Sequence, residues 1–145
     1  MENFKFRLQK VLDMKIKDEE ESKIKYSKAQ NEKRVVEEEL KNLKSNYKKY
    51  SNEINIEDIV SRKITSNYLN SLSNIINIKS NELLKKEELV NESRLELIDK
   101  QIKRKSIEKL KDNKYILHKK KEDQKEQAIN DEFGLYAYLR KAQNW

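Results

Sequence analysis

The chain has 145 residues, of which 41% are charged, and it contains one glycine, no proline and no cysteine. Proline breaks helix interiors and glycine weakens them, so a chain with almost none of either can be helical along most of its length. Without cysteine it has neither disulfides nor thiolate metal sites, and no apolar run approaches the roughly 20 residues of a membrane-spanning helix. We therefore expect an all-α, cytoplasmic protein that does not insert into a membrane.

The first predicted helix covers about residues 4–54. Polar residues interrupt its apolar stripe between Leu12 and Tyr26 but keep the same register, at Lys15, Glu19 and Ser22. The stripe as a whole has steps of three and four, which average 3.5 residues, the period of a coiled coil. Tyrosine suits a thin helix interface because its ring packs while its hydroxyl stays hydrated. The apolar members of this stripe are Phe4, Leu8, Leu12, Tyr26, Ala29, Val36, Leu40, Leu43, Tyr47, Tyr50 and Ile54.

Residues 55–67 are predicted to reverse the chain through a short bridging helix. The stretch contains neither glycine nor proline, so no sharp turn is indicated, and isoleucine and valine are crowded among serine and asparagine. Asn55 is a residue type that caps helices, and Asp58 would then lie in the first turn, where a negative charge is favourable.

The second predicted helix covers about residues 68–141. After Ile107 its stripe is predicted to slip by one residue, a discontinuity that changes local supercoiling. Before the slip the stripe consists of Leu69, Leu72, Ile76, Lys79, Leu83, Lys86, Val90, Ser93, Leu97, Lys100, Arg104 and Ile107. After it the stripe consists of Leu110, Lys114, Leu117, Lys121, Gln124, Ala128, Asp131, Leu135 and Tyr138.

Neither helix can bury its stripe alone, so the predicted fold is a long antiparallel two-helix coiled coil forming one domain, residues 1–145. In this arrangement the two ends of the chain are expected to meet. Phe4, Leu8 and Leu12 would then lie near Leu135 and Tyr138. The other large apolar residues near the C-terminus have little core to fill, which makes Tyr136 and Leu139 candidates for contact with a partner protein.

The sequence predicts no enzyme and no cofactor. A single glycine excludes phosphate-binding and dinucleotide-binding loops. The only histidine, His118, lies in a basic stretch and is expected to be an exposed helix residue. The acidic clusters at 18–21 and 37–39 are expected to be solvated and to pair with nearby lysines.

The net charge is +7, and residues 100–125 by themselves carry a basic excess as large as that of the whole chain. Tyr115 is the only aromatic residue in this stretch, which therefore lacks the stacking platform of single-strand binders. The pattern favours a solvated face or an acidic protein partner over nucleic acid or anionic lipid. A basic helical rod that binds nucleic acid, or a plain structural spacer, remains the alternative interpretation. The basic patch consists of Lys103, Arg104, Lys105, Lys119, Lys120 and Lys121.

Four stretches in this order and spacing give the chain its resemblance to a known family. They are FKFRLQKVLDMKIKDEEESK at the start, LKNLKSNYKKYSNEI before the bend, NYLNSLSNIINIKSNEL after it and KKKEDQKEQAINDEFG near the end. Over essentially its whole length the chain resembles the FliJ family of flagellar type III export proteins. The injectisome equivalents of this family are similar.

The resemblance implies a non-enzymatic stalk that promotes the hexameric export ATPase ring and links it to the membrane export gate and to export chaperones. It further implies a cytoplasmic protein held at the membrane only through these partners. In the family the partner surface lies on both helices near the bend. Matching the motifs places that surface here at Leu43, Tyr50 and Ile75.

Overall fold

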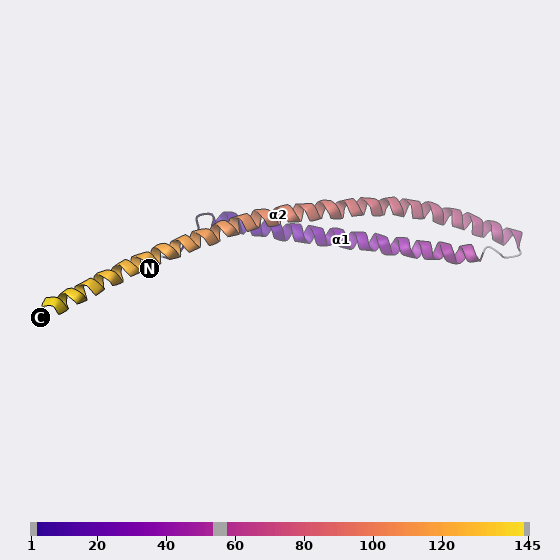
Figure 1. Ribbon diagram of the computed structural model, residues 1–145. Helices are drawn as coiled ribbons and strands as arrows, with labels where there is room; N and C mark the ends of the chain where they lie inside the picture. The colour runs from indigo at the N-terminus through magenta and orange to yellow at the C-terminus, as the bar shows by residue number, and fades with distance from the viewer. Residues whose placement is uncertain (1–2, 54–57, 144–145) are drawn as a thin grey trace. The chain divides into compact units, whose positions relative to one another are not determined.

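Two long helices form the fold, α1 (Gln9–Asn52) and α2 (Ile59–Gln143), as Figure 1 shows. The computed structural model describes residues 3–53 and 58–143. The regular secondary structure of these ranges is entirely helical, and the two helices pack against each other, which confirms the predicted all-α class. The described residues divide into two groups, Asp18–Lys100, and the residues up to Lys17 together with those from Gln101 onward. That the whole chain forms one domain stays a prediction.

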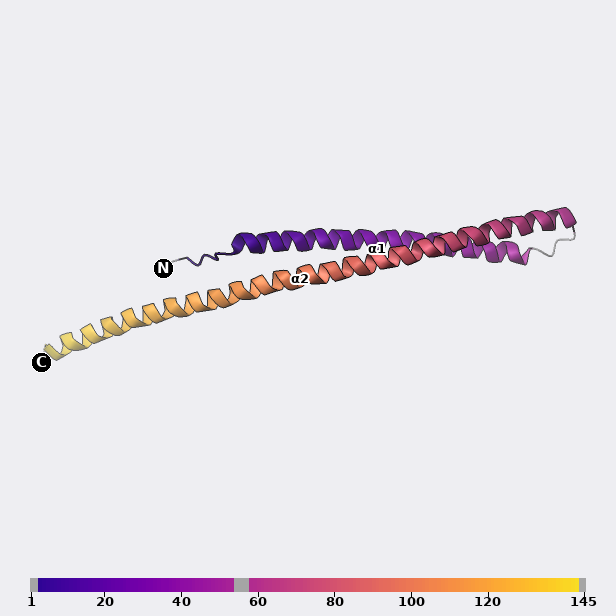
Figure 2. The same cartoon turned by 90° about the horizontal axis from the view of Figure 1, so that it is seen from above.

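Within Asp18–Lys100, α1 and α2 run antiparallel and lie side by side in both views (Figures 1 and 2). Ion pairs between the helices define their register. Lys25 Nζ lies 2.9 Å from Glu96 Oε2. Nearer the bend, Lys86 pairs with Glu32 at 3.3 Å and Lys79 with Glu39 at 2.6 Å. As the α1 residue of each ion pair moves toward the C-terminus of α1, its partner moves toward the N-terminus of α2. This is the order that an antiparallel pair requires.

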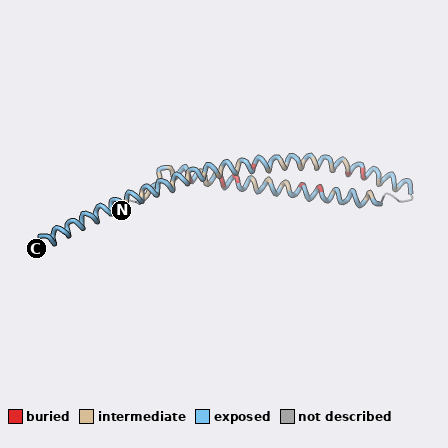
Figure 3. Tube along the Cα trace, in the orientation of Figure 1, coloured by how far each residue is buried: buried red, intermediate tan, exposed pale blue. Residues whose placement is uncertain are grey.

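The buried residues lie on the predicted stripes, and the described stripe positions as far as Ile107 are buried or half-buried, except Tyr47, which is 38% exposed. The predicted register is confirmed at these positions. Leu69 and Leu72 retain only 7% and 4% of their exposed area. Polar stripe positions are buried too, namely Glu19, Ser22 and Ser93. Figure 3 shows buried and half-buried residues recurring along the facing sides of the two helices. The 3.5-residue period therefore identifies the interface even where the side chain is polar.

Asp58 caps α2 directly, so α2 begins earlier than predicted. Its Oδ1 accepts a hydrogen bond from the backbone N–H of Val60 at 3.1 Å, and its Oδ2 accepts one from Ser61 Oγ at 3.0 Å. The first is the bond of an N-cap residue, which satisfies one of the free backbone N–H groups of a first helical turn. Residues 59–67, where a separate bridging helix was predicted, form the first turns of α2. Residues 54–57, including the predicted cap Asn55, lie outside the described residues.

Residues 3–8 are not helical, and the predicted start of the first helix at residue 4 is wrong by five residues. Phe4, Phe6 and Leu8 are half-buried, whereas Lys5 and Arg7 between them are exposed. This alternation is that of an extended chain, in which every second side chain faces the same way. A helix would turn Phe4 and Phe6 by about 200° from each other, so only the extended form lets both rings contact α2.

The expectation that the two ends of the chain meet is wrong. The Phe4 ring lies 5.4 Å from the ring of Tyr115, while Leu135 and Tyr138 are 58% and 70% exposed. The cause is the unequal length of the helices, 44 residues in α1 and 85 in α2, so the N-terminal segment meets α2 well before its end.

The stripe predicted after the slip at Ile107 does not match the residues that are half-buried in this part of α2. Leu110 and Leu117 are 37% and 53% exposed, and the half-buried positions are instead Lys111, His118 and Glu122. Here the neighbour of α2 is an extended segment rather than a helix, so the heptad rule of a two-helix interface no longer applies.

Lys79 links the two helices, which gives the interface a pH dependence. Hydrogen bonds from its ammonium group to Glu39 and then to Glu82 raise the pKa of Lys79 above its ordinary value of 10.5. A lysine whose pKa is raised on folding adds to the free energy of unfolding. This contribution is fully present below the unfolded-state pKa and is lost as the pH rises through the folded-state pKa. We expect Lys79→Gln to lower the Tm slightly at pH 7–9, with the difference from wild type shrinking above pH 10.5 and disappearing once the pH exceeds the raised folded-state pKa.

The measurement is thermal unfolding followed by circular dichroism across that pH range. Lys85→Gln is the matched control, because Lys85 is an exposed lysine on the same helix. A Tm difference for Lys79→Gln that persists at high pH would show that the ammonium charge is not what stabilises this contact.

Candidate functional site

The surface predicted near the bend is built from both helices of Asp18–Lys100. Leu43 lies one turn nearer the bend than Glu39, and Ile75 lies one turn nearer the bend than Lys79. Because Glu39 and Lys79 form an ion pair, Leu43 and Ile75 are at the same level of the helix pair. Leu43 is half-buried and Ile75 is 43% exposed. One therefore belongs mainly to the interface, and the other presents apolar area to the surface.

Tyr50 lies two turns closer to the bend and contacts Tyr68, a residue that the sequence analysis did not single out. The two rings meet edge to face, with centroids 5.0 Å apart and an interplanar angle of 83°. Lys49 Nζ also lies 5.7 Å from the centre of the Tyr50 ring. Tyr68 directly precedes the first stripe residue of α2, so the heptad pattern gave no sign of it. Tyr68 is 43% exposed, and Ile75 and Ile78, two and nearly three turns further along α2, are exposed as well.

The second candidate surface is the C-terminal part of α2, where every residue from 123 to 143 is exposed (Figure 3). Tyr136 and Leu139, the residues proposed from sequence, are 62% and 45% exposed. They are three residues apart and so lie on one side of the helix. Other large apolar side chains surround them on the same stretch, namely Ile129, Phe133, Leu135 and Tyr138.

The basic patch does not form one face. Lys103, Arg104 and Lys105 follow one another along α2, so each points about 100° away from the next. Arg104 is half-buried and its Nη1 donates to Glu108 Oε2 at 2.7 Å. Lys119, Lys120 and Lys121 are exposed and diverge around the helix in the same way. A continuous track for a phosphate backbone is therefore absent from these six positions.

His118 is half-buried rather than exposed as predicted, because the Phe4 ring lies 5.5 Å from its imidazole ring. The sequence signal for this contact was the alternation in FKFRL, which was interpreted as part of a helix. Among the described residues, no cluster of histidine and carboxylate side chains is arranged to hold a metal ion. Neither described helix has a stretch apolar enough to cross a bilayer.

The comparisons with known proteins agree with this arrangement of two long packed helices. The family model described as "Flagellar FliJ protein" matches residues 4–143, which is nearly the whole chain. Comparison with curated proteins gives no match, and comparison with solved structures gives none either. A match over this length, on a helical coiled coil of this form, shows the family. The chain therefore belongs to the FliJ family and is a component of the flagellar export apparatus.

Proposed function

We propose that this protein is a non-enzymatic stalk of the flagellar type III export apparatus, which promotes assembly and activity of the hexameric export ATPase. One observation carries the proposal. The C-terminal part of α2 exposes a run of large apolar side chains, among them Phe133, Tyr136 and Tyr138, without any covering element among the described residues. Exposed apolar clusters of this kind are typical of surfaces that bind another protein.

In this proposal the end of α2 enters the ATPase ring. The surface of Leu43, Tyr50 and Ile75 near the bend contacts the export gate and the export chaperones. The protein itself stays in the cytoplasm, at the face of the membrane, and is held there through these partners. Its contribution is mechanical and interfacial, because it offers helix surfaces to its partners and no chemical groups to a reaction.

The test is stimulation of ATP hydrolysis by the cognate export ATPase. We expect Tyr136→Ser with Leu139→Ser to leave helicity and Tm nearly unchanged, since both side chains are already exposed. Stimulation should fall about tenfold, because two apolar contacts with the ring are removed.

The matched control is Leu84→Ser with Leu95→Ser. These residues are 59% and 61% exposed, also on α2, but they lie within Asp18–Lys100. The control should stimulate like wild type. Full stimulation by the intact Tyr136/Leu139 variant would remove this end of α2 from the ATPase contact, and loss of its fold would mean that the cluster is structural.

A further inference from the structure

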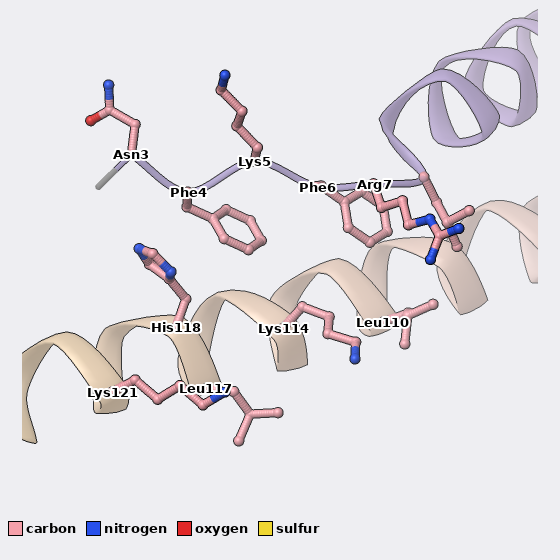
Figure 4. A pocket seen from close by; sticks show the side chains of 11 residues that line it. Asn3, Phe4, Lys5, Phe6, Arg7, Leu110, Lys114, Leu117, His118 and Lys121 are labelled. Atoms are coloured by element: carbon pink, nitrogen blue, oxygen red, sulfur yellow. The ribbon is translucent and has the colours of Figure 1, made fainter. Parts of the chain in front are cut away.

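The extended N-terminal segment and α2 form a groove that the proposed function does not use. Its volume is about 750 Å³, and Figure 4 shows the residues that line it. The rings of Phe4 and Phe6 point from the segment toward α2, whereas Lys5 points away. On α2 the lining extends from Leu110 to Lys121, about three helical turns.

The groove is held open by contacts at both ends of the segment. Near its start the Phe4 ring packs against Tyr115 and His118, at 5.4 Å and 5.5 Å between ring centres. At its end, where α1 begins, Lys111 Nζ donates a hydrogen bond to Gln9 Oε1 at 2.7 Å. The groove therefore exists before any partner binds, so that little ordering entropy opposes binding.

All the ionisable side chains that line the groove are basic or histidine. Arg7 comes from the segment, and Lys114 and Lys121 come from α2, with His118 between them. Lys5 also borders the groove, although its side chain points away from α2. No aspartate or glutamate is among the lining residues. The positive charge of this lining therefore favours a negatively charged ligand.

The α2 side of the groove also has the pattern of a coiled-coil face. Leu110, Lys114, Leu117 and Lys121 follow one another at steps of four, three and four, the spacing that presents side chains to a second helix. The two leucines are exposed. In this group of described residues α1 begins only at Gln9, beside Lys111, so no helix is paired with this face.

We propose that this groove binds an acidic amphipathic helix of a partner protein. The leucines at steps of seven would contact its apolar stripe, and the lysines and Arg7 would pair with carboxylates along its edges, as in other helix-in-groove complexes. Nucleic acid fits less well. The Phe4 ring already packs against Tyr115 and His118 and offers no free platform for a base, and the leucines among the lining residues cannot stack on one. The inference goes beyond the proposed function and uses none of its residues.

Binding of a designed probe peptide to the full-length protein tests the inference. The probe is a fluorescein-labelled peptide of about three heptads, with leucine at the core positions and glutamate at the flanking ones. Fluorescence anisotropy near 150 mM salt should show saturable binding. A peptide of the same composition, with its leucines moved off the heptad spacing, should bind at least about tenfold more weakly.

Two variants and their matched controls locate the site. Lys114→Glu with Lys121→Glu should weaken binding of the probe about tenfold, and Leu110→Asn with Leu117→Asn should do the same. Lys48→Glu with Lys85→Glu makes the same charge change at exposed lysines elsewhere, and Leu84→Asn with Leu95→Asn makes the same polarity change. Both controls should bind like wild type, and circular dichroism should show all four variants to be helical.

Four results would overturn the inference. The first is absence of saturable probe binding, and the second is equal loss in the controls. Another is tighter binding of a twenty-nucleotide single-stranded oligothymidylate under the same conditions, which would make the groove a nucleic-acid site. The last is self-association seen by sedimentation and abolished by the Leu110/Leu117 variant, which would make a second copy of this chain the occupant.

Discussion

Replacing Leu72 with alanine is expected to lower the free energy of unfolding by about 2–3 kcal/mol. Leu72 is 4% exposed and is one of only three buried residues among the described part of α2, with Leu69 and Ser93. An interface with so few buried residues has little capacity to collapse around a missing side chain or to compensate for it elsewhere. The Tm should fall by roughly 6–10 °C, as measured by thermal unfolding in circular dichroism.

Leu84→Ala is the matched control for this substitution. The same change is made on the same helix, but Leu84 is 59% exposed and lies off the predicted stripe. Its effect should remain below about 0.5 kcal/mol. Equal destabilisation by the two variants would contradict the assignment of the stripe as the core of the interface.

Ile75→Asp is expected to abolish most binding to the export gate while the protein stays folded. The side chain is 43% exposed, so the charge can remain in water, but it lies on the surface proposed to contact the gate. A carboxylate placed in an apolar contact must be desolvated without a partner, so affinity should fall by about tenfold or more. Binding of the purified gate domain and flagellar motility in a complemented deletion strain are the two readouts.

The control for Ile75→Asp is Leu95→Asp, which adds the same charge at a 61% exposed position farther from the bend. It should bind the gate and restore motility as wild type does. If Ile75→Asp binds normally with an unchanged circular dichroism spectrum, the gate contact lies elsewhere on the chain. If Ile75→Asp unfolds, Ile75 contributes to the helix interface rather than to a surface.

The sequence alone determined the interface between the two helices. Spacing of three and four is a property of helix geometry, so it identifies the inward face whatever residue stands there. Glu19, Ser22 and Ser93 are buried for this reason, although their chemistry favours solvent. The near absence of glycine and proline permitted helices along most of the chain, and together with the 3.5-residue period it indicated the all-α class.

For the C-terminal surface, the sequence predicted that Tyr136 and Leu139 are not needed in the helix interface. Both side chains are exposed. The pairing of Tyr50 with Tyr68 could not be predicted, because it depends on where the chain reverses. Asp58, which was predicted to lie in the first turn of a bridging helix, instead caps α2 directly through its carboxylate.

The tertiary structure alone decided what happens to residues 3–8. Their sequence permits a helix, and the periodicity of Phe4, Leu8 and Leu12 favours one. The extended form prevails because it places Phe4 and Phe6 together against α2, and α2 is long enough to extend beneath them. A local pattern cannot reveal this outcome, since it depends on apolar area offered by residues more than a hundred positions away in the chain.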